Sequence, residues 1–410
     1  MSQSAAVLLC RLIGDDPRWT SEVSADTWPT LWKMSQTADV AGLLAHRTLA
    51  AGAALPAPLR ERALARFTSE TRHHGFHFVE AERLTALLDA RGIPSVLLKG
   101  VSLAPTVYEH PACRGFRDLD VLVPPDTVDE TIAALVQDGW AIGGPPELVP
   151  AYRAQHFHLA FEAPGRPPLE VHWGVTRPDD LYHVDIGPFF ADAAPVAGGA
   201  RFRGPHPDDQ LLHAAASLMR CGFSELKRLV DVDRMIRGGA PLRPERVIAR
   251  AREGRLLPAV RLMLELAHDL FGTPVEPWLG PVPTLGTARR RLDALGVPGF
   301  PFGFPPSGWS PSRHFVRFWL LPAKARVLAQ YLTRPRFERA RLDALAVPVR
   351  PRVTSAAKRC VLLAWFAAWQ LALAVRGHRD PFLQGLRSAA GRPSSAPPAG
   401  GTAGTPGRAP

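Results

Sequence analysis

The stretch 97–123 constrains the fold more than any other part of the chain, because its pattern changes from strand to helix and back to strand. Short apolar runs predict two strands, at 95–98 and 119–123, and helical spacing predicts a helix between them. A Lys-Gly turn follows the first strand, and two aspartates stand at the start of the second. This order predicts an α/β unit in this part of the chain.

The chain on either side of this stretch divides into units of different composition. Alternating strand and helix patterns indicate a folded core, and the segments before and after it have helical spacing. We expect an N-terminal helical region at 1–91, the core at 92–200, a helical lobe at 205–290, a C-terminal basic helical region at 313–385 and a disordered tail at 388–410. The predicted fold class is α+β.

The positive charge of the chain is concentrated near its C-terminus. The net charge is +11, whereas 301–410 alone holds 17 Lys or Arg and only 3 Asp or Glu. Clustered arginines neutralise phosphate, so this segment can serve nucleic acid, an acidic protein partner or a membrane surface. Because base-stacking aromatics do not alternate with its basic residues, nucleic acid is the less favoured of these partners.

Cysteine usage and hydropathy indicate a reduced, cytoplasmic protein. The four cysteines are far apart and form no CxxC pair, which excludes a zinc knuckle. The start of the chain lacks the pattern of a secretory signal. The apolar run 361–375 is shorter than the roughly 20 residues that span a bilayer, so we expect a buried helix there and no transmembrane segment.

His73 and His77 lie four residues apart in a predicted helix, a separation that suits two metal ligands on one face. The glutamate that follows the first histidine in the HExxH zinc motif is replaced here by His74. A solvated or capping role is therefore the favoured interpretation of this pair.

Asp118 and Asp120 are the strongest candidates for chemistry. They are separated by one residue, so in a strand both carboxylates point to one face, while Leu119, Val121 and Val123 point to the buried face. Two adjacent carboxylates repel each other unless a cation lies between them. Magnesium prefers such oxygen ligands, and two Mg²⁺ ions at a site of this kind support nucleotidyl transfer from a nucleoside triphosphate.

The turn before the helix supplies candidate phosphate ligands in Lys99, Gly100 and Ser102. A glycine at a strand-to-helix turn lets phosphate approach the backbone, and the helix N-terminus favours anions. Arg114 and Arg117 are close enough in sequence to neutralise phosphate, although Arg117 is equally suited to a salt bridge with an aspartate.

Glu170 is the candidate third acid. It lies in a predicted strand at 169–173, where it can act as a metal ligand or as a general base toward an acceptor hydroxyl. His172 lies on the same face of this strand as Glu170, which makes it a candidate support for the acids. His156 and His158 share a face of the preceding strand.

These residues together resemble the bacterial uncharacterised nucleotidyltransferase family, within the DNA polymerase β-like nucleotidyltransferase superfamily. The matching residues, over about 90–240, are Leu98-Lys99-Gly100, Tyr108, Arg114, Asp118, Asp120 and Glu170-Val171-His172-Trp173. The resemblance implies a small mixed β-sheet flanked by helices, three acids that hold Mg²⁺ and a nucleoside triphosphate, and a helical lobe that closes over the nucleotide. The chain has Gly100-Val101-Ser102 where the superfamily has Gly-Gly or Gly-Ser, which leaves open whether the Val101 amide or the Ser102 hydroxyl meets the phosphates.

Asp231 and Asp233 lie in a predicted helix of the lobe, and Asp231 resembles an acidic position of the same family. Asp233 interrupts an apolar stripe, so it either pairs with a buried arginine or faces the cleft.

The predicted function is Mg²⁺-dependent transfer of a nucleoside monophosphate to an acceptor, with release of pyrophosphate. A small molecule, a peptide or protein, and a tRNA remain open as acceptors. The alternatives are a catalytically silent nucleotide-binding or adaptor protein and a nucleotidyltransferase of the toxin-antitoxin type.

Overall fold

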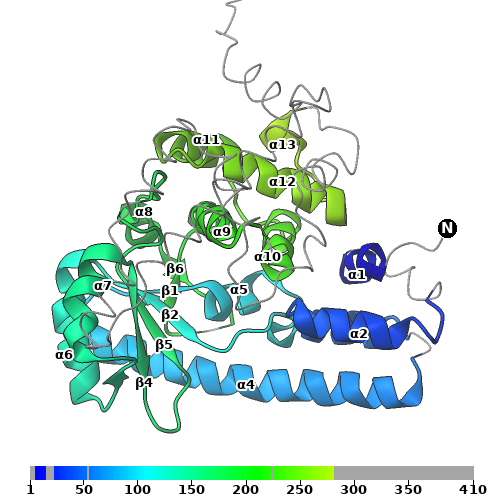
Figure 1. Cartoon of the computed structure of the whole chain (residues 1–410), viewed down its shortest axis with the longest axis horizontal. Coiled ribbons are helices and arrows are strands. Elements are labelled where there is room, and N and C mark those ends of the chain that lie inside the picture. The colour runs from blue at the N-terminus through cyan, green and yellow to red at the C-terminus, as the bar shows by residue number, and fades with distance from the viewer. Residues whose placement is uncertain are drawn as a thin grey trace, which may run out of the picture. The chain divides into compact units, whose positions relative to one another are not determined.

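The computed structural model describes residues 5–14, 23–52, 55–178, 180–198, 200–223 and 225–280. Helices and strands are mixed along this part of the chain, which confirms the predicted α+β class (Figure 1). The basic helical region expected at 313–385, with its apolar run, and the tail expected at 388–410 lie outside the described residues. No helix among the described residues is long and apolar enough to cross a membrane.

A five-stranded mixed sheet forms the centre of the fold. Its strands follow the order β1, β2, β5, β4, β3, and only β2 and β5 run parallel. The strands are β1 (Val96–Leu98), β2 (Leu119–Leu122), β3 (Ala141–Ile142), β4 (His158–Glu162) and β5 (Leu169–His172). A separate two-stranded pair consists of β6 (Ala194–Pro195) and β7 (Arg203–Gly204). The mixed sheet agrees with the fold that the family resemblance implies.

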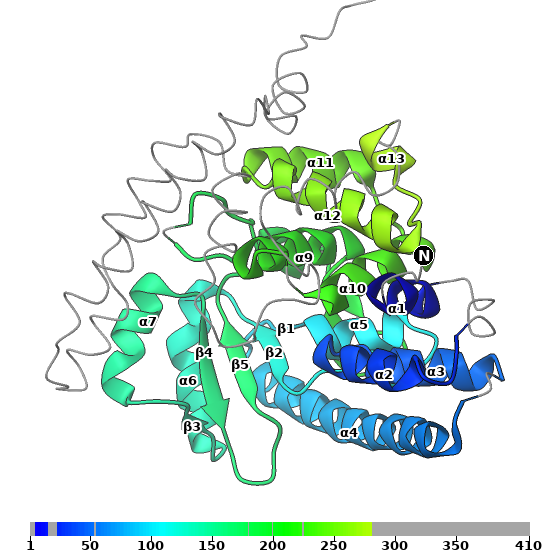
Figure 2. The ribbon, with the colours of Figure 1, turned by 45° about the vertical axis from the view of Figure 1, so that its right-hand side comes forward.

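One face of the sheet packs on the long helix α4 (Ala57–Asp89), which runs beneath the strands in Figures 1 and 2. Leu119, Val121 and Val123 have no exposed surface and share one apolar cluster with Leu84 and Leu88 of α4. This confirms the expectation that these three β2 residues face the core. The aspartates consequently lie on the opposite face.

The opposite face of β1 and β2 is only partly apolar. Val96, Leu98 and Leu122 form a smaller cluster there with Phe189 of the short helix α8 (Gly187–Ala191). Asp120 and Glu170 lie on this second face, beside that cluster.

Helices precede the strands in the chain, lie between them and follow them. The N-terminal helices are α1 (Ala5–Ile13), α2 (Trp28–Thr37), α3 (Ala41–Ala50) and α4. Between the strands lie α5 (Lys99–Val107), α6 (Val128–Gln137), α7 (Val149–Gln155) and short 3-10 turns, among them η2 (Pro111–Cys113) and η3 (Pro125–Thr127). Asp126 lies in η3 and is not the N-cap of the following helix, because α6 begins only at Val128.

The helical lobe consists of α9 (Pro207–Cys221), α10 (Leu226–Arg237), α11 (Pro244–Glu253), α12 (Leu257–Phe271) and α13 (Glu276–Leu279). The side chain of His206 caps α9 by accepting a hydrogen bond from the Asp208 amide. Helix α10 contacts both α9 and α5, so the lobe reaches the turn that follows β1.

Candidate active site

Three carboxylates converge on the polar face of the sheet. Asp120 of β2 lies directly opposite Glu170 of β5, and Asp118 immediately precedes β2. One carboxylate oxygen from each of the three lies within 4.8 Å of the other two. The parallel pairing of β2 and β5 therefore brings residues 50 positions apart into one acidic group.

The two aspartates have opposite electrostatic surroundings. Burial, then the neighbouring charge of Asp120, raises the pKa of Asp118. Burial also acts on Asp120, but Lys99 and the hydrogen bond from His172 outweigh it and hold the pKa of Asp120 well below its usual value. The ionised form of Asp120 is therefore stabilised, whereas Lys99 and Lys227 offset the raised pKa of Asp118 only in part.

Lys99 supplies the positive charge within this acidic group. Its Nζ donates to Asp120 Oδ1 and lies 3.8 Å from Glu170 Oε2. Lys99 has a φ of +51°, the left-handed conformation that non-glycine residues rarely adopt. Residues in such sparsely populated conformations cluster at functional sites.

Gly100 is required by the close approach of another side chain. A Cβ at this position would lie 2.4 Å from the Cβ of Phe116. The side-chain position of Gly100 is therefore filled by Phe116, and the approach of phosphate to the Gly100 backbone stays a prediction.

Ser102 is 1% exposed and belongs to the buried side of α5. Its Oγ would lie 2.4 Å from a Cβ at Gly204 and accepts a long, 3.5 Å hydrogen bond from Gln210 Nε2. The structure thus places the Ser102 hydroxyl against β7 and α9.

Two histidines border the carboxylates. His172 has no exposed surface, and its Nε2 lies 2.8 Å from Asp120 Oδ1 and 3.3 Å from Glu170 Oε2. His158 Nδ1 lies 3.5 Å from the same Glu170 oxygen, and burial lowers the pKa of His158, so its ring is neutral. His158, Glu170 and His172 form a second group with metal-ligand spacing, which shares Glu170 with the first.

Arg114 is engaged by a residue of the helical lobe. Its Nε and Nη2 donate to the two oxygens of Asp231 at 3.0 and 2.7 Å, and the Tyr108 hydroxyl donates to Asp231 at 2.6 Å. All three side chains are at least nine-tenths buried. The sequence placed Arg114 at phosphate; the structure shows a buried ion pair that joins the segment before β2 to α10.

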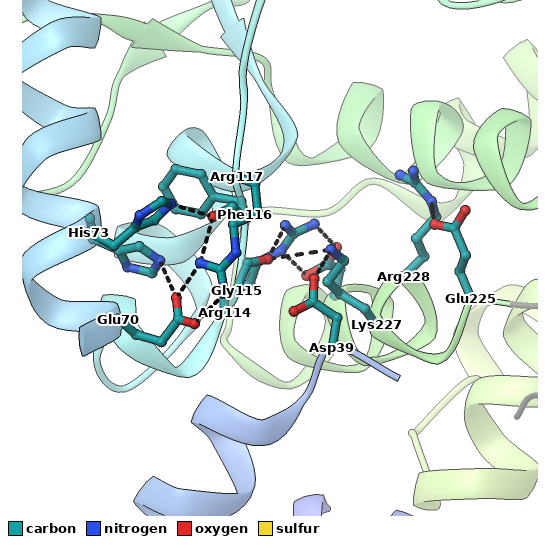
Figure 3. Close-up of polar contacts among 12 residues, drawn as sticks. Asp39, Glu70, His73, Arg114, Gly115, Phe116, Arg117, Glu225, Lys227 and Arg228 are labelled. Atoms are coloured by element: carbon teal, nitrogen blue, oxygen red, sulfur yellow. Dashed lines mark hydrogen bonds and ion pairs between the residues drawn. The ribbon is translucent and has the colours of Figure 1, made fainter. Parts of the chain in front are cut away.

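Arg117 pairs with an acid of α4. It donates to both oxygens of Glu70 on α4, at 2.7 and 3.1 Å, and this contact replaces the expected ones to phosphate or aspartate (Figure 3). His73 Nε2 lies 3.0 Å from the Phe116 carbonyl, and His77 Nε2 lies 3.2 Å from the Arg117 carbonyl. The histidine pair therefore binds the backbone before Asp118 and is neither a capping nor a solvated pair.

Asp233 pairs with an arginine, the first of the two alternatives that its place in an apolar stripe left open. Its Oδ1 accepts from Arg237 Nε at 2.8 Å and from the Thr273 hydroxyl at 2.7 Å. It ties α10 to the end of α12.

Arg228 and His213 are residues of this region that the sequence does not single out. Both line a small hollow that also includes Lys99 and Arg114. Arg228 is one of many arginines in this chain, and His213 lies in an amphipathic helix. The sequence therefore contains no signal that distinguishes either residue.

The donor set suits a divalent cation. Three carboxylates offer hard oxygen ligands at short mutual distances. Burial, and after it the charge of Asp120, raises the pKa of Asp118, and Lys99 offsets this only in part. Asp120 Oδ1 accepts from the Lys99 ammonium, so one of the three carboxylates already faces a positive charge.

A mixed sheet with two acids on neighbouring strands and a third directly before one of them, covered by helices on both sides, defines an α+β protein of the nucleotidyltransferase type. The family described as uncharacterised nucleotidyltransferase matches residues 24–272 of the chain. The chain therefore belongs to this nucleotidyltransferase family, whose match includes the helices α2 to α4 as well as the core and lobe. A comparison with curated proteins found no match.

Proposed function

We propose that the protein is a divalent-metal-dependent enzyme of the polymerase β-like superfamily that transfers a nucleoside monophosphate from a triphosphate to an acceptor hydroxyl. The observation that supports this best is the convergence of Asp118, Asp120 and Glu170 within 4.8 Å. An acceptor oxygen forms a bond to the α-phosphorus, the bond from that phosphorus to the bridging oxygen breaks, and pyrophosphate leaves with the electron pair.

Asp118, Asp120 and Glu170 are the proposed ligands of Mg²⁺, and two ions fit the family resemblance. When bound, Mg²⁺ supplies charge neutralisation for the attacking and leaving oxygens. His172 orients Asp120 through its hydrogen bond, which keeps one carboxylate oxygen fixed at the site.

Glu170 is the proposed acceptor of the proton from the attacking hydroxyl. Its side chain is 27% exposed, whereas that of Asp120 is 2% exposed, so Glu170 is the more accessible of the two to an incoming acceptor. General-base catalysis requires hydrogen-bond reach to the reacting hydroxyl, which an exposed carboxylate at the rim of the site provides.

Lys99 and the backbone at the start of α5 are the proposed contacts to the phosphates. The first amides of a helix have no partner within the helix and attract anions. Lys99 is the first residue of α5, so its ammonium and the helix N-terminus act from one place.

The acceptor is proposed only by class: a small molecule, a peptide or protein, or a tRNA. The basic segment 301–410 suits an acidic acceptor or partner. The proposal of a cytoplasmic location rests on the sequence, in which four widely spaced cysteines form no CxxC pair.

The test is to incubate the full chain with Mg²⁺, each α-labelled nucleoside triphosphate and a cell extract, and to separate labelled macromolecules from labelled small molecules. We expect labelling by the wild type and by Asp129→Asn, whose carboxylate is 84% exposed and lies outside the acidic group. Asp118→Asn and Asp120→Asn should label nothing. Equal labelling by these two variants and the wild type would refute the proposed site.

A further inference from the structure

A group of three potential metal ligands lies outside the acidic group. It consists of His46 of α3, Cys113 of η2 and Glu109, which lies between α5 and η2. One imidazole nitrogen, one carboxylate oxygen and the sulfur all lie within 4.8 Å of one another. None of these three residues belongs to the sheet or to the proposed active site, so the two groups are separate. Below, this feature is called the mixed-ligand group.

The backbones of α3 and η2 are in close contact beside this group. A Cβ at Gly42 of α3 would lie 2.2 Å from the Ala112 carbonyl oxygen, so only a glycine permits this approach. His46 follows Gly42 by four residues and therefore lies on the same face of the helix, the face toward η2. Backbone packing thus fixes His46 relative to Cys113.

His46 is available as a ligand. Its ring stacks on Phe67 of α4, with the ring centroids 5.5 Å apart and 20° between the ring planes. This contact restrains the imidazole, whose nitrogens form no hydrogen bond with another described residue. Burial is the largest effect that lowers the pKa of His46, so its ring is neutral at pH 7 and offers a lone pair to a metal.

Glu109 is held in position by arginines. Arg47 Nη2 donates to Glu109 Oε1 at 2.5 Å, and Arg234 Nη1 of α10 lies 3.9 Å from the same oxygen. Hydrogen bonds of this kind orient carboxylate ligands of metals. The second oxygen of Glu109 accepts no hydrogen bond from a described residue, and the 42% exposure of this side chain gives an ion access from solvent.

Cys113 determines which metal suits the group. It is 2% exposed, and burial, followed by the charge of Glu109, raises the pKa of its thiol to about 12. The thiol is therefore protonated in the metal-free protein, and a bound metal ion displaces this proton. Sulfur and imidazole ligands favour Zn²⁺, whereas Mg²⁺ and Mn²⁺ prefer carboxylate, carbonyl and water oxygens.

We propose that His46, Glu109 and Cys113 bind Zn²⁺, at a site separate from the three carboxylates and independent of the proposed function. Ligand atoms around a tetrahedral Zn²⁺ lie about 3.3–3.6 Å apart, so movements of about 1 Å by each side chain complete the site. Three protein ligands leave the fourth position of the ion for water.

Zn²⁺ at this site ties α3 to the segment that contacts the helical lobe. Two of its ligands, Glu109 and Cys113, are chain neighbours of residues that bind α10. These are Tyr108 and Arg114, which both donate to Asp231. The ion therefore stabilises the folded protein, and Zn²⁺ should raise the temperature of thermal unfolding.

The test titrates Co²⁺, as a spectroscopic substitute for Zn²⁺, into the full metal-free chain. Excess Mg²⁺ is present to compete for sites made of oxygen ligands alone. A thiolate ligand gives bound Co²⁺ a charge-transfer band in the near ultraviolet, and oxygen ligands give none. We expect one such Co²⁺ per chain, released by Zn²⁺. Cys113→Ser should abolish the band, and His46→Gln should weaken Co²⁺ binding at least about tenfold.

The matched control is Cys221→Ser. Cys221 is also free and buried, and its Sγ donates to the Leu218 carbonyl, a contact that a serine hydroxyl can keep. This variant should retain the band. Thermal unfolding in EDTA shows whether each variant is folded. If Cys113→Ser does not fold, His46→Gln decides the test, because His46 is only partly buried and Zn²⁺ should raise the unfolding temperature of this variant less than that of the wild type.

Absence of the band from the wild type, a band that persists in Cys113→Ser, or its equal loss from Cys221→Ser would each overturn the inference. Co²⁺ binding that is unchanged by His46→Gln would overturn it as well. Failure of the proposed nucleotidyl transfer would leave these results unchanged, since the mixed-ligand group shares no residue with the acidic group.

Discussion

Asp120 and Glu170 lie opposite each other on two parallel strands, so their carboxylates leave the same face of the sheet at neighbouring positions. Residues paired across neighbouring strands point to the same side of the sheet. The register of β2 and β5 therefore brings these two acids together directly on the strands. The arrangement depends on how β2 and β5 pair and not on a flexible segment. A rigid base of this kind holds reacting groups in fixed geometry.

The turn at Gly100 should tolerate no side chain. Gly100→Ala places a Cβ 2.4 Å from the Phe116 Cβ, and we expect it to destabilise the protein by about 1–3 kcal/mol. The control is Gly75→Ala in α4, where a Cβ meets no atom within 4 Å. Since alanine is the better helix former, Gly75→Ala should stabilise by about 0.5–1 kcal/mol. Urea unfolding of both variants measures the difference, and equal effects would contradict this account of Gly100.

The buried pair Arg114–Asp231 should be the most important ion pair for stability among those described here. Asp231→Asn leaves the Arg114 charge buried without its partner, and we expect a loss of about 3–5 kcal/mol in the free energy of unfolding. Arg153→Gln breaks an exposed pair with Asp129 and should change stability by about 1 kcal/mol or less. Denaturant titration compares the two, and a small effect of Asp231→Asn would show that Arg114 has another partner.

Lys99 and the proposed divalent cation would compete for the same carboxylate oxygen of Asp120, so we expect Lys99→Met to have two effects of opposite direction. Without the ammonium on Asp120, Mn²⁺ should bind more tightly in calorimetry. The KM for the triphosphate should rise, because a phosphate contact is lost. A variant that weakens both metal and triphosphate binding would indicate that Lys99 only maintains the fold of the turn.

We expect Asp39 to account for part of the loss of protein stability at acidic pH. Burial raises its pKa, but Lys227 outweighs burial and holds the pKa of Asp39 below its usual value. A carboxyl with a lowered folded-state pKa stabilises the protein above its unfolded pKa, and this contribution is lost as the pH falls through the folded value. Asp39→Asn should therefore lower stability at pH 7 and reduce the loss of stability below about pH 4.

Asparagine is the suitable replacement because Asp39 has a φ of +56°, which asparagine tolerates. The control is Asp126→Asn, at an exposed carboxyl. Unfolding measured at several pH values tests the pair, and parallel pH profiles for Asp39→Asn and the wild type would contradict the assigned role of Lys227.

The sequence was sufficient for the elements that depend on local patterns. Alternation at 118–123 predicted the buried and polar faces of β2, and the apolar runs predicted β1, β4 and β5. The two-residue strand β3 was missed because so short a strand leaves no period to detect. The family match also starts at residue 24, well before the region that the motif resemblance covered.

Partners distant in sequence could not be predicted in the same way. Arg117 pairs with Glu70 and Arg114 with Asp231, across 47 and 117 positions, and nothing in a single sequence distinguishes these acids from other nearby ones. His213 and Arg228 likewise become visible only when α9 and α10 pack against the β1–α5 turn. The acids could be anticipated from strand periodicity, whereas the cations around them depend on tertiary packing.

The most direct measurement is the anomalous difference density of a crystal soaked with Mn²⁺ and a non-hydrolysable nucleoside triphosphate. We expect a manganese peak within about 2.5 Å of oxygens of Asp118, Asp120 and Glu170. The terminal phosphates of the nucleotide should lie beside Lys99. His46, Glu109 and Cys113 form another group with metal-ligand spacing among the described residues. Manganese bound at that group, with none at the three carboxylates, would contradict the proposed active site.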